Sequence, residues 1–529
     1  MLFRSQLRPT SSRSERKQSS FVILSDVKAA RAGTCWMRSW VAMGDSWLAT
    51  NGVVSERTEA MSATRIERDP LGELPVPEDA LYGIQTERAR RNFPISHLAP
   101  LAPFVDAVIW IKKAAALTHR ETKRLDAPLA DAIVRAADEV LGGAHRDQFV
   151  VDPYQAGAGT SHNMNCNEVL ANRANELLGG KRGVYQPVHP NDHVNMAQST
   201  NDVIPTAIRL AALAQLPALL DALSRLGRAF LAKGKAFDRI LKSGRTHLQD
   251  ATPIRLGQEF TAYGHTIERH RDRVAQAADA LRDLGIGGTA VGTGLNAEPE
   301  YPRLMVQHLA ALSGLELREG RDRVQLMQSL GDAAALSGAL RTYAMDLGKI
   351  AGDLRLLASG PRTGLAEIVL PAVQPGSSIM PGKVNPSIAE MVNMVCYQAL
   401  GNDVTIAAAA EAGQLELNVM MPVIAHNLLF TMAILANATR VFAERCVEGI
   451  EADAAQCEHW LERSPALVTA LAPKIGYAEA AKLAKEAVAK NMTVRQLVME
   501  KGILKGKDLE EVLDLAAMTE IGVPGRRKK

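Results

Sequence analysis

Four segments of the chain combine glycine with hydroxyl and amide side chains immediately before an apolar helical pattern. They are GAGTSHNMNCNEVL from Gly157, QSTNDVIP from Gln198, GRTHLQDATPIRLGQEF from Gly244 and PGSSIMPGKVNPSIAEM from Pro375. We interpret each as a helix N-terminus, where free backbone N–H groups and the helix dipole favour an anion by roughly 0.3–1 kcal/mol. Each segment alone has a simpler explanation as an ordinary helix cap. The four together favour a site for a dicarboxylate.

The segment from Pro375 has the composition of a catalytic loop. Two Pro-Gly pairs bracket a turn that presents Ser377, and Lys383 follows six residues later. A serine acts as a general base only when oriented N–H donors or a nearby positive charge stabilise its alkoxide, and a glycine-rich turn with a lysine provides both. We expect the turn to move as a lid and Asn385-Pro386 to cap and open the next helix. An ordinary surface turn is the alternative interpretation.

Other chemistries find little support in the sequence. The glycines of GIGGTAVGTGLN from Gly285 lack the GxGxxG spacing, and Gly382-Lys383 is followed by valine, so neither nucleotide-binding motif is met. The histidines form no HExxH pattern, which argues against a metal centre. The five cysteines are odd in number and widely spread, as expected of reduced thiols in the cytosol. We therefore predict a cytoplasmic protein that requires no metal and no cofactor.

Composition limits the fold and the partners. Of the 529 residues, 47% are hydrophobic and only 4% are aromatic, and abundant alanine and leucine suit closely packed helices. The 61 basic and 58 acidic residues nearly cancel, so neither nucleic acid nor an anionic membrane is indicated as a partner. No run approaches the roughly 20 consecutive apolar residues of a membrane span. We expect a mainly all-α protein that binds a small molecule.

Residues 1–62 differ in composition from the rest of the chain. Arginine and serine dominate the first 20 residues, which is typical of an organellar transit peptide. The sequence MSATRIERDPLGE from Met61 instead suggests a fresh beginning, so we favour an over-extended start codon. We expect this extension to be disordered.

Long helical patterns fill the middle of the chain. One apolar stripe has the spacing of a bundle helix and consists of Leu213, Leu216, Leu220, Leu223 and Phe230. Similar patterns cover residues 254–284, 324–357 and 387–446, with an interruption near Gly413. We predict an N-terminal domain at residues 63–200, a central helical bundle at 201–455 and a small helical domain at 456–529, which ends in a solvated basic tail.

At GSSIMPGKVNP, residues 376–386, the sequence resembles the fumarase/aspartase superfamily, whose members eliminate across a carbon–carbon bond to give fumarate. The similarity begins at RIERDPLGELPVPEDALYGIQTERARRNFPIS, continues through GAGTSHNMNCNEVLANRANELLGG, NDHVNMAQSTNDVIPTAIRLA and GRTHLQDATPIRLGQEF, and reaches EAGQLELNVM near residue 415. It covers essentially everything after residue 63. The resemblance implies a three-domain fold with a central bundle of long helices. It also implies a homotetramer with active sites assembled from three subunits.

The family's functional residues are carried over where the motifs match. The resemblance makes Ser377, His247 and Lys383 catalytic, with Ser377 as the base that removes the Cβ proton. Lys383 and Asn385 would hold one substrate carboxylate, and Glu390 would stand behind His247. The other expected contacts to the dicarboxylate are Thr160, Ser199, Thr200, Asn201, Thr246, Ser378, Ile379 and Met380.

Only the leaving group, ammonia or water, separates the two branches of the family. Four spellings resemble the aspartase branch: GAGTS rather than GSGTQ, QSTND rather than QSSND, GRTHLQD rather than GRTHTQD, and EAGQLELNV rather than GASGNFELNV. We therefore expect reversible deamination of L-aspartate to fumarate through an aci-carboxylate intermediate. Hydration of fumarate to L-malate is the alternative.

Other positions point the other way. NRANELLGGKRG and PVHPNDHVN resemble fumarases, and His162 and Met421 depart from the aspartase pattern. A changed polar lining could alter selection of the amine, or the two changes are neutral. A catalytically silent helical scaffold is a third interpretation, and the retained Ser377, Lys383 and His247 argue against it.

Overall fold

Helices dominate the described part of the chain. The computed structural model describes residues 63–525, so the predicted extension at 1–62 and the basic tail Arg526–Lys529 lie outside the described residues. One hydrophobic core extends from Val76 to Ile450, and a second joins Leu461 to Leu513. Strands within this range occur in short two-stranded sheets. The prediction of a mainly all-α fold is confirmed.

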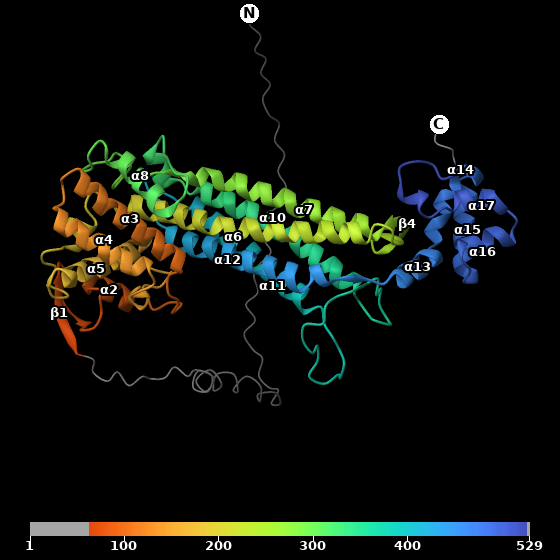
Figure 1. Ribbon diagram of the computed structural model, residues 1–529, viewed down its shortest axis with the longest axis horizontal. Helices are drawn as coiled ribbons and strands as arrows, with labels where there is room; N and C mark the ends of the chain where they lie inside the picture. The colour runs from red at the N-terminus through yellow and green to blue at the C-terminus, as the bar shows by residue number, and fades with distance from the viewer. Residues whose placement is uncertain (1–62, 526–529) are drawn as a thin grey trace, which may run out of the picture. The chain divides into compact units, whose positions relative to one another are not determined.

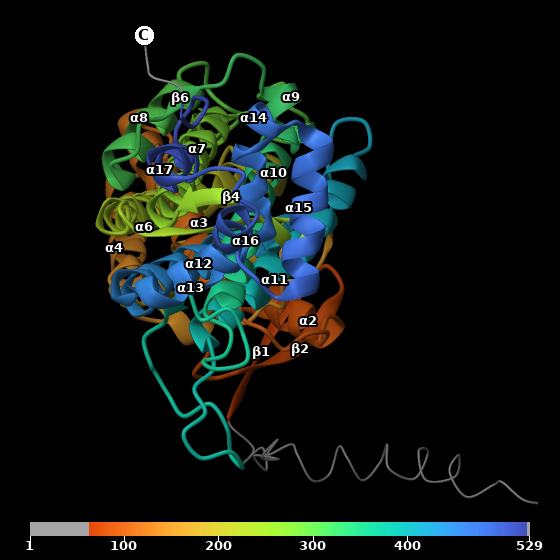
Figure 2. The ribbon, with the colours of Figure 1, turned by 90° about the vertical axis from the view of Figure 1, so that its right-hand side faces the viewer.

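A bundle of long helices forms the centre of the fold (Figure 1). Its members are α6 (Thr200–Ala236), α7 (Leu256–Asp279), α10 (Gly331–Leu357), α11 (Ser387–Glu411) and α12 (Met421–Arg445). Figure 2 shows these helices from one end, with α15 (Tyr477–Lys490), α16 (Val494–Glu500) and α17 (Gly506–Val512) toward the viewer. The stripe predicted after Asp202 lies on α6, and the predicted interruption near Gly413 separates α11 from α12.

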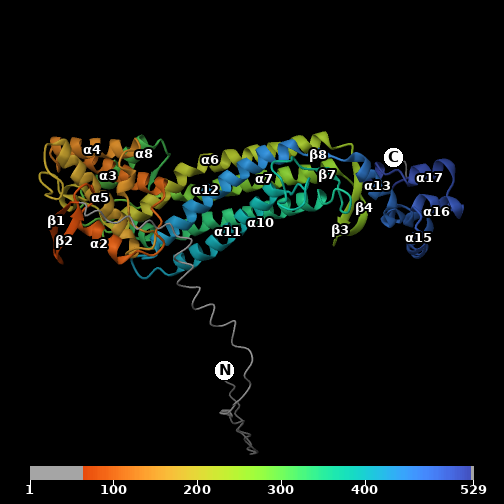
Figure 3. The same cartoon turned by 90° about the horizontal axis from the view of Figure 1, so that it is seen from below.

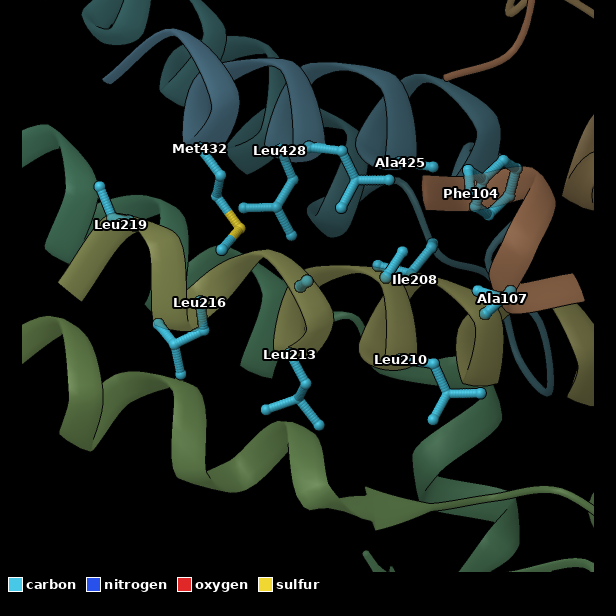
Figure 4. Packing of buried hydrophobic residues seen from close by; sticks show 14 of the residues in the cluster. Phe104, Ala107, Ile208, Leu210, Leu213, Leu216, Leu219, Ala425, Leu428 and Met432 are labelled. Carbon is cyan, nitrogen blue, oxygen red and sulfur yellow. The ribbon is translucent and has the colours of Figure 1, made fainter. Parts of the chain in front are cut away.

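The helix α6 is buried on more than one side. In Figure 4, Leu428 and Met432 of α12 point toward α6, while Leu210 and Leu213 of α6 point away from α12. All four side chains are 2% exposed or less. Fully burying one such side chain stabilises a fold by roughly 1.5–3 kcal/mol, so a helix with apolar residues on several faces belongs at the centre of a bundle.

The N-terminal part of the described chain packs against one end of this bundle. Its elements are β1 (Thr64–Asp69), β2 (Gly72–Pro77), α2 (Ile84–Asn92), α3 (Ala102–Glu121), α4 (Ala127–Leu141), α5 (Thr160–Leu177) and the later helix α8 (Tyr301–Ser313). Because α3 contacts both α6 and α8, residues 63–200 and 201–455 share one hydrophobic core.

The C-terminal helices have their own core. They are α13 (Ala454–Arg463), α14 (Ala472–Ile475) and the helices α15 to α17, and the second core is built from residues 461–513. The predicted boundary between residues 455 and 456 falls inside α13, which packs against the strand β3 (Leu241–Thr246).

Two of the long helical patterns are interrupted. The pattern predicted over residues 254–284 begins in the strand β4 (Gln249–Arg255), and after α7 it ends in the strand β5 (Asp283–Leu284), which pairs with β6 (Arg318–Glu319). The pattern over 324–357 is split into α9 (Arg323–Gln328) and α10, because Ser329 has extended backbone angles. Apolar spacing alone does not register such breaks.

Two segments, α6 and Met421–Gly449, are long and apolar enough by composition to cross a bilayer. Of the most apolar window in each, 72% and 61% is buried inside the fold. Buried core helices have the same composition, so the length and hydropathy of these two segments do not by themselves indicate a membrane span.

The crossing between α6 and α7 depends on glycine. A Cβ atom on Gly257 would overlap the Gly234 carbonyl oxygen and lie 2.7 Å from the backbone N of Asp238. Gly227 of α6 and Gly264 of α7 also face the opposite helix at close range. Small residues therefore allow the two backbones to approach.

We expect Gly257→Ala to destabilise the protein by about 1–3 kcal/mol, the usual cost of overpacking. Thermal unfolding would measure the change. The matched control is Gly352→Ala in α10, where a Cβ meets nothing within 4 Å and a helical alanine is favoured over glycine by roughly 0.5–1 kcal/mol. Equal melting temperatures for the two variants would contradict the close α6–α7 contact.

Candidate active site

The first group of predicted site residues lies where α5 and α6 begin. We call Thr160, Ser199, Thr200 and Asn201 the α6 cluster. Ser199 Oγ accepts a hydrogen bond from Asn201 N at 3.2 Å, and Asp202 accepts one from Ser199 N at 2.9 Å. This capping box leaves the positive end of α6 beside a pocket of about 460 Å³ that Ser199 and Thr200 line. An anion is favoured at such a position.

Thr160 reaches this region because two glycines permit close packing. A Cβ on Gly159, which has a φ of +90°, would lie 3.0 Å from Ile204 of α6. A Cβ on Gly157 would lie 3.2 Å from Val419. The segments GAGTS, QSTND and ELNVM therefore meet at one end of the bundle. Thr160 itself is exposed at the first position of α5.

Buried charges stand behind the α6 cluster. Asp202 Oδ2 accepts hydrogen bonds from Gly287 N and Thr289 N, both at 3.0 Å. Burial raises the pKa of Asp202 to about 6, although its backbone hydrogen bonds and Lys112 act in the opposite direction. Burial also lowers the pKa of Lys112 to about 7. The negative charge of Asp202 and the positive charge of Lys112 favour each other inside the fold, against the effect of burial.

Thr246 and His247 lie in a β-hairpin, so the prediction of a helix N-terminus at Gly244 is wrong. β3 and β4 pair from Leu241 with Arg255 to Thr246 with Gln249, and α7 begins only at Leu256. Pro253 and the dense polar residues resemble a helix start, which explains the error.

The hairpin turn is strained. His247 and Leu248 have φ values of +56° and +58°, the left-handed region that two-residue turns usually fill with Asn-Gly. Side chains in this region cost roughly 1–2 kcal/mol each, and such strain concentrates at functional sites. His247 is exposed and lines a second pocket of about 520 Å³.

A buried ion cluster joins the hairpin to the strand before the catalytic loop. Arg245 donates to both carboxylate oxygens of Glu367, at 3.0 and 2.8 Å. Lys242 lies 3.0 Å from Glu367 and also binds Glu259. Glu367 directly precedes β7 (Ile368–Val369), which pairs with β8 (Glu451–Ala452). A charged pair this buried fixes geometry, because losing one partner is costly.

The predicted catalytic loop holds Ser377 in a suitable environment. Ser377 Oγ accepts hydrogen bonds from Ile379 N at 3.2 Å and Met380 N at 2.9 Å. Two N–H groups aimed at one oxygen favour its negatively charged form. The serine is partly buried, while Ser378 and Lys383 are exposed. Ile379 is 84% exposed and Met380 is 50% exposed.

The base of the loop is closed by its own backbone. Gly376 N donates to Lys383 O at 2.7 Å, and Asn385 Nδ2 donates to Gly376 O at 2.6 Å. The prediction that Asn385 caps the next helix is therefore wrong, because its side chain bonds across the loop instead. α11 begins at Ser387 after Pro386, and Glu390 lies in its first turn. Within residues 63–525 no hydrogen bond joins Glu390 to His247.

Two groups of the predicted site residues, the α6 cluster and the hairpin of Thr246 and His247, lie far apart in one chain. The α6 cluster is at the first residues of α6, and the hairpin follows the last residues of this 37-residue helix. A helix of that length spans about 55 Å. Figure 3 shows β3, β4, β7 and β8 at the end of the bundle remote from β1, β2 and α5. A four-carbon dicarboxylate cannot contact both groups in a single chain.

The two unexpected residues of the sequence lie in the core. His162 is fully buried and stacks on Phe104 with ring centroids 4.8 Å apart, and burial lowers its pKa to about 3. Met421 is also fully buried, at the start of α12. Neither lines the pocket beside the α6 cluster.

Sequence reasoning missed Lys112, Asp202 and Glu367. Lys112 is the first lysine of the KK pair in an amphipathic helix, where a solvated lysine is the ordinary expectation, and Glu367 stands alone between glycine- and proline-rich segments. Only Asp202 could have been found from the sequence. It stands three residues after Ser199, which is the spacing of a capping box at a helix start.

Known proteins share this architecture and these motifs. Residues 72–401 match the family described as Lyase, and residues 467–520 match Fumarase C C-terminus. The chain is 49% identical to the aspartate ammonia-lyase of Bacillus subtilis (strain 168) over 462 residues, 87% of this chain and 97% of the relative. The chain belongs to the fumarase/aspartase superfamily.

Class II fumarate hydratases, which belong to the same superfamily, are as similar to this chain as the aspartate ammonia-lyases are. The class II fumarate hydratase of Halobacterium salinarum is 51% identical over 460 residues, 87% of this chain and 98% of the relative. The crystal structure of fumarate lyase:delta crystallin from Brucella melitensis bound to cobalt has a TM-score of 0.83 at 50% identity, covering 87% of this chain and 100% of that chain.

Among the described residues, no group of three or more His, Cys, Asp or Glu side chains could hold a metal ion.

We expect Gly376→Ala to lower the lyase turnover number on the order of 100-fold, the effect of a misplacement of about 1 Å at a reacting group. The new Cβ would lie 2.7 Å from both Asn385 N and Lys383 O, which forces the loop open. Fumarate formation measures activity, and thermal unfolding should change little because the loop is exposed. Gly352→Ala is the control, and unchanged turnover in Gly376→Ala would contradict the closed loop.

Proposed function

We propose that the protein is an aspartate ammonia-lyase, which reversibly converts L-aspartate to fumarate and ammonia. The observation that carries this proposal is the position of the aspartase-like spellings. GAGTS and QSTND lie at the starts of α5 and α6, and Thr200, the residue that separates QSTND from QSSND, lines the pocket at the N-terminus of α6. The 49% identity to the Bacillus subtilis aspartate ammonia-lyase supports it.

Ser377 supplies the base in this proposal. Its alkoxide, stabilised by Ile379 N and Met380 N, takes the proton from Cβ of the substrate. The electron pair moves into the adjacent carboxylate and gives an aci-carboxylate dianion, which the donors of the α6 cluster stabilise. When the dianion collapses, the Cα–N bond breaks and ammonia leaves. Removing one donor of this kind typically costs about 2.7–4 kcal/mol.

The remaining residues hold the other end of the substrate. Lys383 and Asn385 bind the second carboxylate, while Thr246 and His247 complete the pocket with Glu390 behind them. Ser378, Ile379 and Met380 contact the substrate when the loop closes. This chemistry requires no metal and no cofactor, and the proposed location is the cytoplasm. Neither nucleic acid nor a membrane is a proposed partner.

A homotetramer with shared active sites is part of the proposal. The two groups of site residues are separated along α6, so a complete pocket needs groups from different chains. The outer face of α11 supports such an assembly, since Met394, Tyr397 and Val404 are 64%, 64% and 68% exposed. From residue 391 to 410 this helix has one charged residue, Asp403, which is buried. An uncharged exposed stripe suits contact with a second copy.

Class II fumarate hydratase is the second candidate function. It is favoured by the 51% identity to the Halobacterium salinarum enzyme. Both reactions use the same proton abstraction and the same fumarate, so the fold does not separate them.

Absorbance at 240 nm distinguishes the two candidates, because fumarate absorbs there and aspartate and malate do not. We expect purified protein to form fumarate from L-aspartate, with little from L-malate, and Ser377→Ala to lose this activity because the base is absent. Gly352→Ala, where the added Cβ meets nothing within 4 Å, serves as the control variant. Fumarate from malate alone would make the protein a fumarase.

Mixing two inactive variants tests the sharing of active sites. We expect Ser377→Ala and Thr200→Val each to be nearly inactive. Subunits that are dissociated together and reassembled should regain part of the activity, because some mixed sites receive both intact groups. The control is mixing the same variants without dissociation. Activity that stays at the level of the separate variants after verified subunit exchange would contradict shared sites.

A further inference from the structure

Asn163 of α5 faces the α6 cluster from inside the protein. It is 1% exposed, and its Nδ2 lies 3.2 Å from Asn195 Oδ1 and 3.4 Å from Thr200 Oγ1. All three residues line the pocket of about 460 Å³. The hydrogen bonds among them decide which way the Thr200 hydroxyl points.

The direction of this network is set by Lys112. Its Nζ donates to Asn195 Oδ1 and Gln198 Oε1, both at 2.9 Å. A lysine ammonium has only hydrogens to offer, so Asn195 must present its oxygen. Burial lowers the pKa of Lys112 to about 7, and the neutral amine still has two N–H bonds for the two acceptors.

Asn163 must then present its NH2 group to Asn195, because two carbonyl oxygens would repel each other. One N–H meets Asn195 Oδ1 and the other meets Thr200 Oγ1. Asn163 Oδ1 is left buried without a hydrogen-bond partner in the described structure. Such an unpaired oxygen costs free energy, so this orientation is imposed by the neighbours rather than by Asn163 itself.

We infer that Asn163 is a positioning residue that makes the Thr200 hydroxyl a hydrogen-bond donor to the substrate carboxylate. A hydroxyl that accepts from Asn163 keeps its own hydrogen free. No other hydrogen bond of the Thr200 hydroxyl is present within residues 63–525. The pocket side is open to an anion, and a donor fixed before binding needs no reorganisation. The inference rests on the proposed function, in which Thr200 binds a carboxylate.

A double-mutant cycle of Asn163→Ala and Thr200→Val tests this inference. Calorimetry with succinate, an unreactive four-carbon dicarboxylate, gives the dissociation constant of each variant. We expect Thr200→Val to weaken succinate binding roughly 10-fold to 100-fold, as for a hydrogen bond to a charged group. Asn163→Ala should weaken it several-fold, and should add less than a factor of two in the Thr200→Val background.

Multiplied effects in the double variant would overturn the inference, because Asn163 would then act independently of Thr200. Unchanged binding in Asn163→Ala would overturn it as well. If Asn163→Ala does not fold, Asn163→Ser replaces it, since its side chain is too short to bridge Asn195 and Thr200.

The matched control is Asn165→Ala, a second buried asparagine on α5 that bonds to Val150 N and Gln148 O. We expect it to lower stability while the succinate dissociation constant stays at the wild-type value. Wild-type protein that binds succinate yet forms no fumarate from aspartate or malate would contradict the proposed function alone. The cycle would still decide the role of Asn163.

Discussion

A helix of 37 residues rises about 55 Å, and α6 carries predicted site residues at its start and precedes others at its end. The separation is rigid, because α6 is packed between α7 and α12 over most of its length. No loop movement can bring the hairpin of His247 to Thr200 within one chain. In the proposed enzyme, a site that uses both groups requires neighbouring copies, and the uncharged exposed stripe of α11 offers a surface for them. Under that proposal, catalysis and assembly depend on the same long helices.

The electrostatics of the α6 cluster follow from what is buried behind it. A helix N-terminus attracts anions, but Asp202 already uses Ser199 N, Gly287 N and Thr289 N. This carboxylate tends to repel a dicarboxylate. Lys112 lies in the same buried region and offsets that charge. The pocket thus keeps its attraction for anions through hydroxyl and amide donors of defined direction.

Much of the fold was predictable from apolar spacing. The stripe from Leu213 to Phe230 predicts α6, and the break near Gly413 is confirmed between α11 and α12. The hairpin at residues 241–255 was missed because its polar residues match a helix start and its two-residue turn, His247-Leu248, lacks the Asn-Gly type of turn signal. Asn385 was misassigned because only the folded loop places Gly376 O within reach of its side chain. The buried charges of Lys112 and Glu367 depend on contacts across more than 80 residues. Whether the predicted residues act together on substrate stays a prediction.

The choice between ammonia and water as the leaving group lies in side chains that contact Cα of the substrate. His162 and Met421 looked like objections to an aspartase, because they replace residues of the usual pattern. Both are fully buried in the core, and His162 packs against Phe104 rather than toward the pocket. A side chain that cannot reach the substrate cannot select its leaving group, so these two positions do not count against ammonia. Thr200 remains a pocket-lining position with aspartase-like spelling, and its hydroxyl has its direction fixed by Asn163. Thr200 is therefore the pocket residue on which the proposal of aspartate as the substrate depends.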